Sequence, residues 1–100
     1  MFCSVAHLQT SPQNLDKVVQ IFGEQGIPFV SRQQGFKSVY LVAKPSGEFM
    51  ILNIWDSEEQ ASAWMSNPEH HKMAAPLDAL MSAEPVFDGY EVRAHAVAPS

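Results

Sequence analysis

The sequence has very little cysteine and no long apolar run, and each shortage excludes a class of protein. The single Cys3 cannot close an internal disulfide, and no Cys-x-x-Cys pair is available for zinc or redox exchange. A cytoplasmic protein is therefore expected. No window approaches the roughly 18 apolar residues of a membrane helix, and residues 1–10 lack the pattern of a signal peptide, so neither a membrane span nor export is expected.

Positive charge is also scarce. The chain has 6 Lys and Arg residues against 11 Asp and Glu residues, for a net charge of -5. The basic residues occur singly, whereas binding to a phosphate backbone requires clustered positive charge, so nucleic acid is not an expected partner. The 100 residues, 46% of them hydrophobic, suffice for one domain, which we place at residues 1–97, with residues 98–100 as a flexible tail.

The first third of the chain predicts a strand followed by a helix. Residues 2–8 form a short apolar run that is typical of a strand, and the Ser-Pro pair after it is typical of a helix start. Apolar residues then recur at helical spacing within residues 11–22. We expect this helix to end by Gly23 or Gly26 and residues 27–35 to connect back to the sheet.

The middle of the chain predicts a β-hairpin and then a helical segment. Residues 36–44 and 48–55 are β-rich runs separated by Pro-Ser-Gly, which favours a tight reversal. Ser57 and Gln60 have the spacing of a capping box, and an Asn-Pro pair ten residues later restarts the helix. Pro76 interrupts the apolar stripe that follows, so we expect a kink or two short helices.

Residues 86–97 complete the pattern as a long final strand. The order is then strand, helix, strand, strand, helical segment, strand. This order predicts an α+β, ferredoxin-like βαββαβ antiparallel sheet with its helices on one face.

The hairpin strands indicate that the other face of this sheet is also covered. Residues 39–43 and 49–55 are apolar on both faces, whereas a half-exposed antiparallel strand alternates apolar and polar side chains. One chain supplies only one helical layer. We therefore predict a homodimer in which two sheets pack face to face and form a dimeric α/β barrel.

The stretch GFKSVYLVAKPSGEFMILNIWDSEEQASAWMSNPEHHKMAAPLDAL resembles antibiotic-biosynthesis-monooxygenase-like members of the dimeric α/β barrel superfamily. The likeness rests on a hairpin that ends in Trp55, an acidic capped helix that holds Trp64, and Asn-Pro-Glu-His-His opening the next helix. It extends over nearly all of residues 2–97. The resemblance implies a ligand cleft between sheet and helices in each subunit, and oxidation of polycyclic aromatic compounds or quinols by molecular oxygen without metal or flavin.

A haem-degrading branch of the same superfamily is a less favoured comparison. It is similar in having a Trp on the helix after the third strand, which Trp64 would match. That branch also uses an Asn on the first strand, which this chain lacks, and a His about three turns beyond the Trp, where this chain has Ala74 and Ala75.

His70 and His71 are the candidate catalytic residues. They lie about 100° apart on a helix, so they cannot ligate one metal ion as an i, i+4 pair would, and no metal is expected. Near a helix N-terminus the helix dipole opposes protonation, which leaves a neutral imidazole available as a proton acceptor. The alternative is that both are ordinary surface or capping histidines.

The candidate substrate-binding residues each have an alternative role. Trp64 would stack on an aromatic ligand or simply belong to the core. Asn53 is an amide within an apolar strand, so it either faces the cleft or pairs across the dimer, and the Tyr40 hydroxyl has a similar choice. Arg93 would hold an anionic substrate or form a cross-strand ion pair.

These residues lead to two hypotheses of different class. The first is a cofactor-independent monooxygenase in which His70 or His71 deprotonates an aromatic or quinol-like molecule. The second is a non-catalytic dimeric module for ligand binding or scaffolding, and haem binding is a third and less favoured reading. No cofactor is expected under the first hypothesis.

Overall fold

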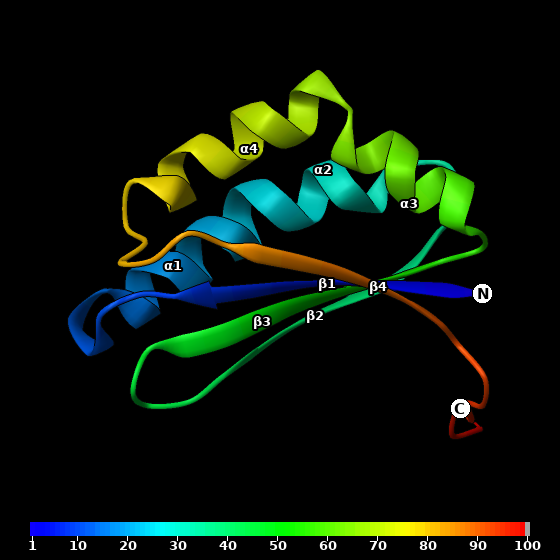
Figure 1. The fold of residues 1–100 in the computed structure, drawn as a ribbon, viewed down its shortest axis with the longest axis horizontal. Helices are drawn as coiled ribbons and strands as arrows, with labels where there is room; N and C mark the ends of the chain where they lie inside the picture. Colours follow the sequence, from blue (N-terminus) through cyan, green and yellow to red (C-terminus); the bar gives the residue numbers. More distant parts are fainter. Residues whose placement is uncertain (100) are drawn as a thin grey trace.

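In the computed structural model, which describes residues 1–99, the helices lie against one face of a four-stranded antiparallel sheet (Figure 1). The strands are β1 (Phe2–Gln9), β2 (Phe36–Ala43), β3 (Glu48–Trp55) and β4 (Val86–Glu91). Their order across the sheet is β2-β3-β1-β4, which confirms the predicted ferredoxin-like α+β fold. Ser100, the last residue of the predicted tail, lies outside the described residues.

The first helical segment is longer than predicted. It consists of η1 (Pro12–Asn14), α1 (Leu15–Ile21), η2 (Phe22–Gly26) and α2 (Ile27–Ser31). The predicted end at Gly23 or Gly26 is wrong because the chain keeps helical backbone angles there, with φ -76° and ψ -51° at Gly26. Pro28 has no N–H to donate to the helix. Just before it, the hydrogen bonds change to the π-helical i to i−5 pattern in η2, where the Ile27 N–H donates to the Phe22 carbonyl.

The second helical segment begins where its capping residues predict. The Ser57 side chain accepts from the Gln60 N–H at the start of α3 (Glu58–Met65). Asn67 accepts from the Glu69 N–H at the start of α4 (Pro68–Asp78). The break between these two helices lies at residues 66–67. Pro76 lies inside the last turns of α4, where the loss of a single hydrogen bond does not end the helix.

The final strand is shorter than predicted. β4 ends at Glu91, and residues 92–99 have no regular structure. The reason is that the neighbouring strand β1 begins at Phe2, which is the residue opposite Glu91. The Val92 N–H donates to the carbonyl of Met1, the residue just before β1. Beyond that point residues 1–99 contain no strand with which residues 92–97 could pair.

The core lies between the sheet and the helices. Trp55 at the end of β3 is fully buried, its indole N–H donates to the Ser4 hydroxyl over 3.1 Å, and the Phe36 ring meets it edge to face. The other large core side chains are Val18, Phe22, Val30, Phe49, Ile51, Trp64, Met73 and Leu77. Burying such apolar side chains is the main term that stabilises the layer arrangement.

Thr10 joins three parts of the chain at one corner of the sheet. It is 1% exposed, its N–H donates to the Gly47 carbonyl, and its hydroxyl donates to the Leu80 carbonyl over 2.6 Å. Gly47 has φ +95°, and a Cβ at this position would collide with the Thr10 carbonyl oxygen. The hairpin loop therefore requires glycine at this position.

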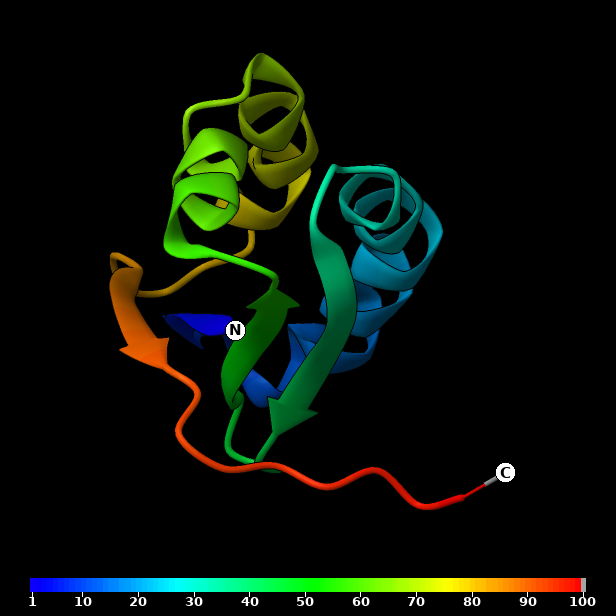
Figure 2. The same ribbon diagram turned by 90° about the vertical axis from the view of Figure 1, so that its right-hand side faces the viewer.

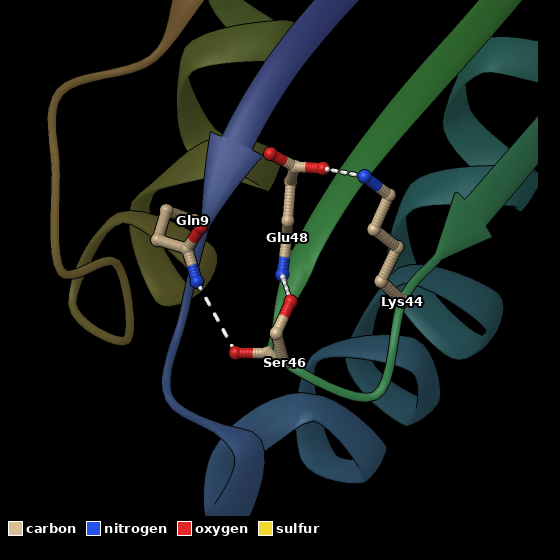
Figure 3. Close-up of polar contacts among 4 residues, drawn as sticks. All are labelled: Gln9, Lys44, Ser46 and Glu48. Carbon is tan, nitrogen blue, oxygen red and sulfur yellow. Dashed lines mark hydrogen bonds and ion pairs between the residues drawn. The ribbon is translucent and has the colours of Figure 1, made fainter.

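Polar contacts hold the same loop from outside (Figure 3). Lys44 and Glu48 pair across the reversal at 2.8 Å, and the Gln9 side-chain amide donates to the Ser46 carbonyl over 3.3 Å. The predicted hairpin is confirmed with the strand bounds given above.

The sheet face away from the helices, which we call the open face, carries an apolar surface. Side chains alternate along each strand, and the register places Val5, Tyr40 and Leu52 side by side on this face. Its outer parts are solvent-exposed, with Tyr40 60% and Tyr90 54% exposed. Residues 92–99 run past the sheet on this same side (Figure 2). Among residues 1–99, no helix has the length and apolar character that crossing a bilayer requires.

Candidate functional site

A cavity of about 470 Å³ lies between the sheet and the two helical segments. Most of its floor consists of side chains of β1, β3 and β4 that point toward the helices, and its roof is formed by residues of η2, α2, α3 and α4. Aromatic rings supply much of the wall, and the lining rings are Phe2, Phe22, Trp64, His70 and Phe87. The volume and apolar wall are those of a small-molecule site.

Gly89 of β4 lacks a side chain, and the Phe2 ring occupies the space beside it in the cavity floor. A Cβ on Gly89 would lie 2.5 Å from the tip of the Phe2 ring, so a larger residue at position 89 would displace that ring from its present position. Ser4, which accepts from the Trp55 indole, and Ala6 complete the β1 side of the floor. Small residues in the sheet therefore leave open the volume that the aromatic rings surround.

Two polar side chains in the cavity lack the hydrogen bonds that buried groups normally have. Asn53 Oδ1 and His70 Nδ1 are buried, and neither has a partner within residues 1–99. Both residues line the cavity, Asn53 from β3 and His70 from α4. Leaving a buried polar atom unpaired costs about 1–3 kcal/mol, so such atoms call for an explanation.

His70 lies where neutral imidazole is favoured. Burial lowers the pKa of His70 below its ordinary value of 6.5, and the charge of neighbouring His71 lowers it further. The nearby Met65 backbone and the negative charge of Asp78 act on this pKa in the opposite direction but are weaker. The His70 ring also packs against Trp64, with ring centroids 5.0 Å apart. A neutral imidazole next to an aromatic wall is able to accept a proton.

The structure brings together three of the six predicted site residues. Asn53, Trp64 and His70 line the cavity. His71 is exposed on the outside of α4, Tyr40 points to the open face, and Arg93 is exposed beyond the end of β4.

The reason for each of these three placements is geometric. His71 is one residue, about 100°, further around the helix than His70. Tyr40 is opposite Leu52, whose side chain lies on the face away from the cavity. Arg93 follows a strand that stops at Glu91, so it has no cross-strand position from which to reach the floor.

The family model for antibiotic biosynthesis monooxygenases matches residues 1–76. The chain belongs to this family. The matched residues include β1, β3, α3 and most of α4, and therefore Asn53, Trp64 and His70. A search of curated protein sequences returns no match.

Solved structures similar to this family member confirm the fold. A protein of unknown function from Nitrosomonas europaea has a TM-score of 0.80 at 13% identity, covering 99% of this chain and 95% of its own. Rv0793 from Mycobacterium tuberculosis has a TM-score of 0.76 at 13% identity, covering 96% and 98%. SnoaB from Streptomyces nogalater, a cofactor-independent oxygenase, has a TM-score of 0.74 at 17% identity, covering 94% of each chain.

Several lining residues of this family domain were not predicted from the sequence. They include Phe2, Phe22, Glu58, Asp78 and Phe87. A helical signal was available for α4, because His70, Met73, Ala74 and Leu77 have the i, i+3, i+4, i+7 spacing of one face. That spacing distinguishes His70 from His71. Glu58 and Asp78 carry no comparable signal, because they border the cavity only after the two helices pack.

The lowered pKa of His70 predicts a pH effect on stability. Below pH 6.5 the unfolded chain binds the His70 proton more readily than the folded domain does, so the free energy of unfolding falls as the pH drops toward the folded-state pKa. Urea unfolding is measured at pH 7.5 and at pH 5.5. Between these two values the free energy of unfolding is expected to fall less in His70→Asn than in the wild type. The matched variant His71→Asn is expected to keep most of the wild-type loss. An equal loss in all three proteins would contradict this account.

Proposed function

We propose that this protein binds a small aromatic or quinol-like molecule in the cavity and oxidises it with molecular oxygen, without a cofactor. The observation that carries the proposal is the pair of buried, unpartnered atoms, Asn53 Oδ1 and His70 Nδ1, in a cavity with aromatic walls. Family membership supports it, and the similar SnoaB is a cofactor-independent oxygenase. The single cysteine, which is unpaired, favours a cytoplasmic setting.

Each cavity residue has a role that follows from its chemistry. The Asn53 carboxamide oxygen accepts a hydrogen bond from a hydroxyl of the ligand. Trp64 packs against the ligand ring, and His70 accepts a proton from the ligand because burial keeps its imidazole neutral. His71, Tyr40 and Arg93 have no part in this chemistry, because they lie outside the cavity.

The ligand itself supplies the electrons in this chemistry. Once His70 takes its proton, the resulting enolate or phenolate transfers an electron to molecular oxygen, and the two radicals combine. For a methylene carbon the overall change is from CH₂ to C=O, with one oxygen atom kept and the other released as water. The protein contributes binding, orientation and the proton transfer.

The test combines binding with oxygen consumption. We expect quinols and anthrone-like compounds to shift the Trp64 indole N–H signal in a saturable way, with Trp64→Phe assigning that signal against Trp55. A ligand that binds is expected to raise oxygen uptake above the uncatalysed rate, and His70→Gln to lower the enzymatic part by about 10²–10⁴-fold. The exposed neighbour variant His71→Gln serves as the control. Absence of any saturable shift across the panel would contradict the proposal.

A second candidate function is binding without oxidation. None of the six Lys and Arg residues, all within the described part of the chain, lines the cavity, so no side-chain cation is placed to stabilise an oxyanion. This observation favours a module that holds its ligand without turning it over. Saturable binding combined with an unchanged rate of oxygen uptake would support this alternative over the oxygenase.

We also propose that two copies associate through the open face. That face exposes Tyr40, Val42, Val86 and Tyr90 beside the half-buried Leu52, and apolar area of this kind is stabilised by a second copy of the same surface. Two sheets packed in this way would form the dimeric α/β barrel. Light scattering at micromolar concentration is expected to give twice the mass of one 11.1 kDa chain.

A further inference from the structure

The ionisable groups around the cavity are predominantly acidic. Glu58, at the start of α3, and Asp78, at the end of α4, are solvent-exposed residues that belong to its lining, and the negative charge of Asp78 acts on His70. Asp88 also contributes to the lining, but its carboxylate pairs with His7 at 3.0 Å on the open face. Within residues 1–99 no lysine or arginine belongs to the lining, so a negatively charged ligand would find no side-chain cation to pair with, other than a protonated imidazole.

The unpartnered Asn53 oxygen independently restricts the ligand. Asn53 Oδ1 is a hydrogen-bond acceptor, so the group that satisfies it must donate. A hydroxyl or an amine donates, whereas a carboxylate only accepts. A carboxylate could pair only with the Nδ2 group of the same amide, and it would face like charge from Glu58 and Asp78.

We infer that the cavity selects aromatic ligands whose polar group donates hydrogen bonds and carries no negative charge. Aromatic alcohols and amines are admitted, and aromatic carboxylates are rejected. This inference rests on the proposed binding function and makes it more specific. Glu58 and Asp78 set the charge preference, and Asn53 sets the preference for a donor.

The experiment compares three ligands with one ring system: naphthalene-2-methanol, 2-naphthylmethylamine and 2-naphthoate. Their dissociation constants are measured from the Trp64 indole N–H shift at pH 7.5 and low salt. We expect 2-naphthoate to bind at least about tenfold more weakly than the alcohol. Binding of 2-naphthoate as tight as that of the alcohol would overturn the inference and leave the proposed function intact. If none of the three binds, both fail.

Charge variants test the role of the two carboxylates. In the double variant Glu58→Gln/Asp78→Asn, the ratio between the dissociation constants of the carboxylate and the alcohol is expected to fall roughly threefold to tenfold. The amine is expected to bind more weakly than it binds to the wild type. The control is Glu59→Gln/Glu69→Gln, which removes two exposed carboxylates of the same helices that lie outside the lining. An unchanged ratio in the first variant, or an equal fall in the control, would overturn the assignment to Glu58 and Asp78.

Discussion

Replacing Leu52 with aspartate is expected to convert the proposed dimer into a monomer. Leu52 is opposite Val5 on one side and Tyr40 on the other, near the middle of the open face. A carboxylate there would be buried without a partner when two sheets pack, and that penalty amounts to several kcal/mol per copy. Light scattering at micromolar concentration is the measurement, with the mass expected to fall by half.

The control for this variant introduces the same charge elsewhere. Ala63 is exposed on α3, away from the open face, so Ala63→Asp is expected to keep the mass of the wild type. Urea unfolding of Leu52→Asp checks that any monomer is folded. A wild type that is already monomeric at micromolar concentration, or a Leu52→Asp protein that keeps the full mass, would rule out this interface.

Replacing Trp55 with alanine is expected to lower the free energy of unfolding by roughly 3–5 kcal/mol. The side chain is fully buried, contacts the Phe36 ring and donates from its indole to Ser4. For a domain with a total stability of about 5–15 kcal/mol, this loss is a large fraction of the whole. Chemical denaturation monitored by circular dichroism gives the value.

Ser4→Ala separates the two parts of the Trp55 effect. It keeps the indole packed but removes the acceptor of its N–H, which is expected to cost about 1–3 kcal/mol. The alanine variant at position 55 should therefore lose clearly more than Ser4→Ala. A loss below about 1 kcal/mol for Trp55→Ala would mean that neighbouring side chains refill the space.

The fold was predictable where local chemistry determines the structure. Ser57 and Asn67 accept from backbone N–H groups at helix starts as their sequence context predicts. The prediction failed where tertiary packing determines the outcome. Gly26 is helical because its backbone is buried against Phe22, and β4 stops at Glu91 because β1 begins at Phe2. Neither fact is encoded in the residues around the boundary itself.

The site was less predictable than the fold, for reasons that differ between residues. Tyr40 could not be assigned to a face, because β2 is apolar on both faces and its register shifts between Phe36 and Ser38. Asn53 was identifiable as a polar residue in an apolar strand, but only the packed helices show that it faces the cavity. Residues on two separate helices, such as Glu58 and Asp78, border the same cavity only once the chain has folded.

The position of β1 at the centre of the sheet has a consequence for the order of folding. β1 is synthesised first, yet its two neighbours begin at Glu48 and Val86. The Thr10 hydroxyl similarly donates to the Leu80 carbonyl, which lies 70 residues further along the chain. Such non-local contacts slow folding, because the entropy of closing long loops is lost before the contacts form. The β2–β3 hairpin is local in sequence, and it is therefore the part of the sheet whose pairing closes the shortest loop.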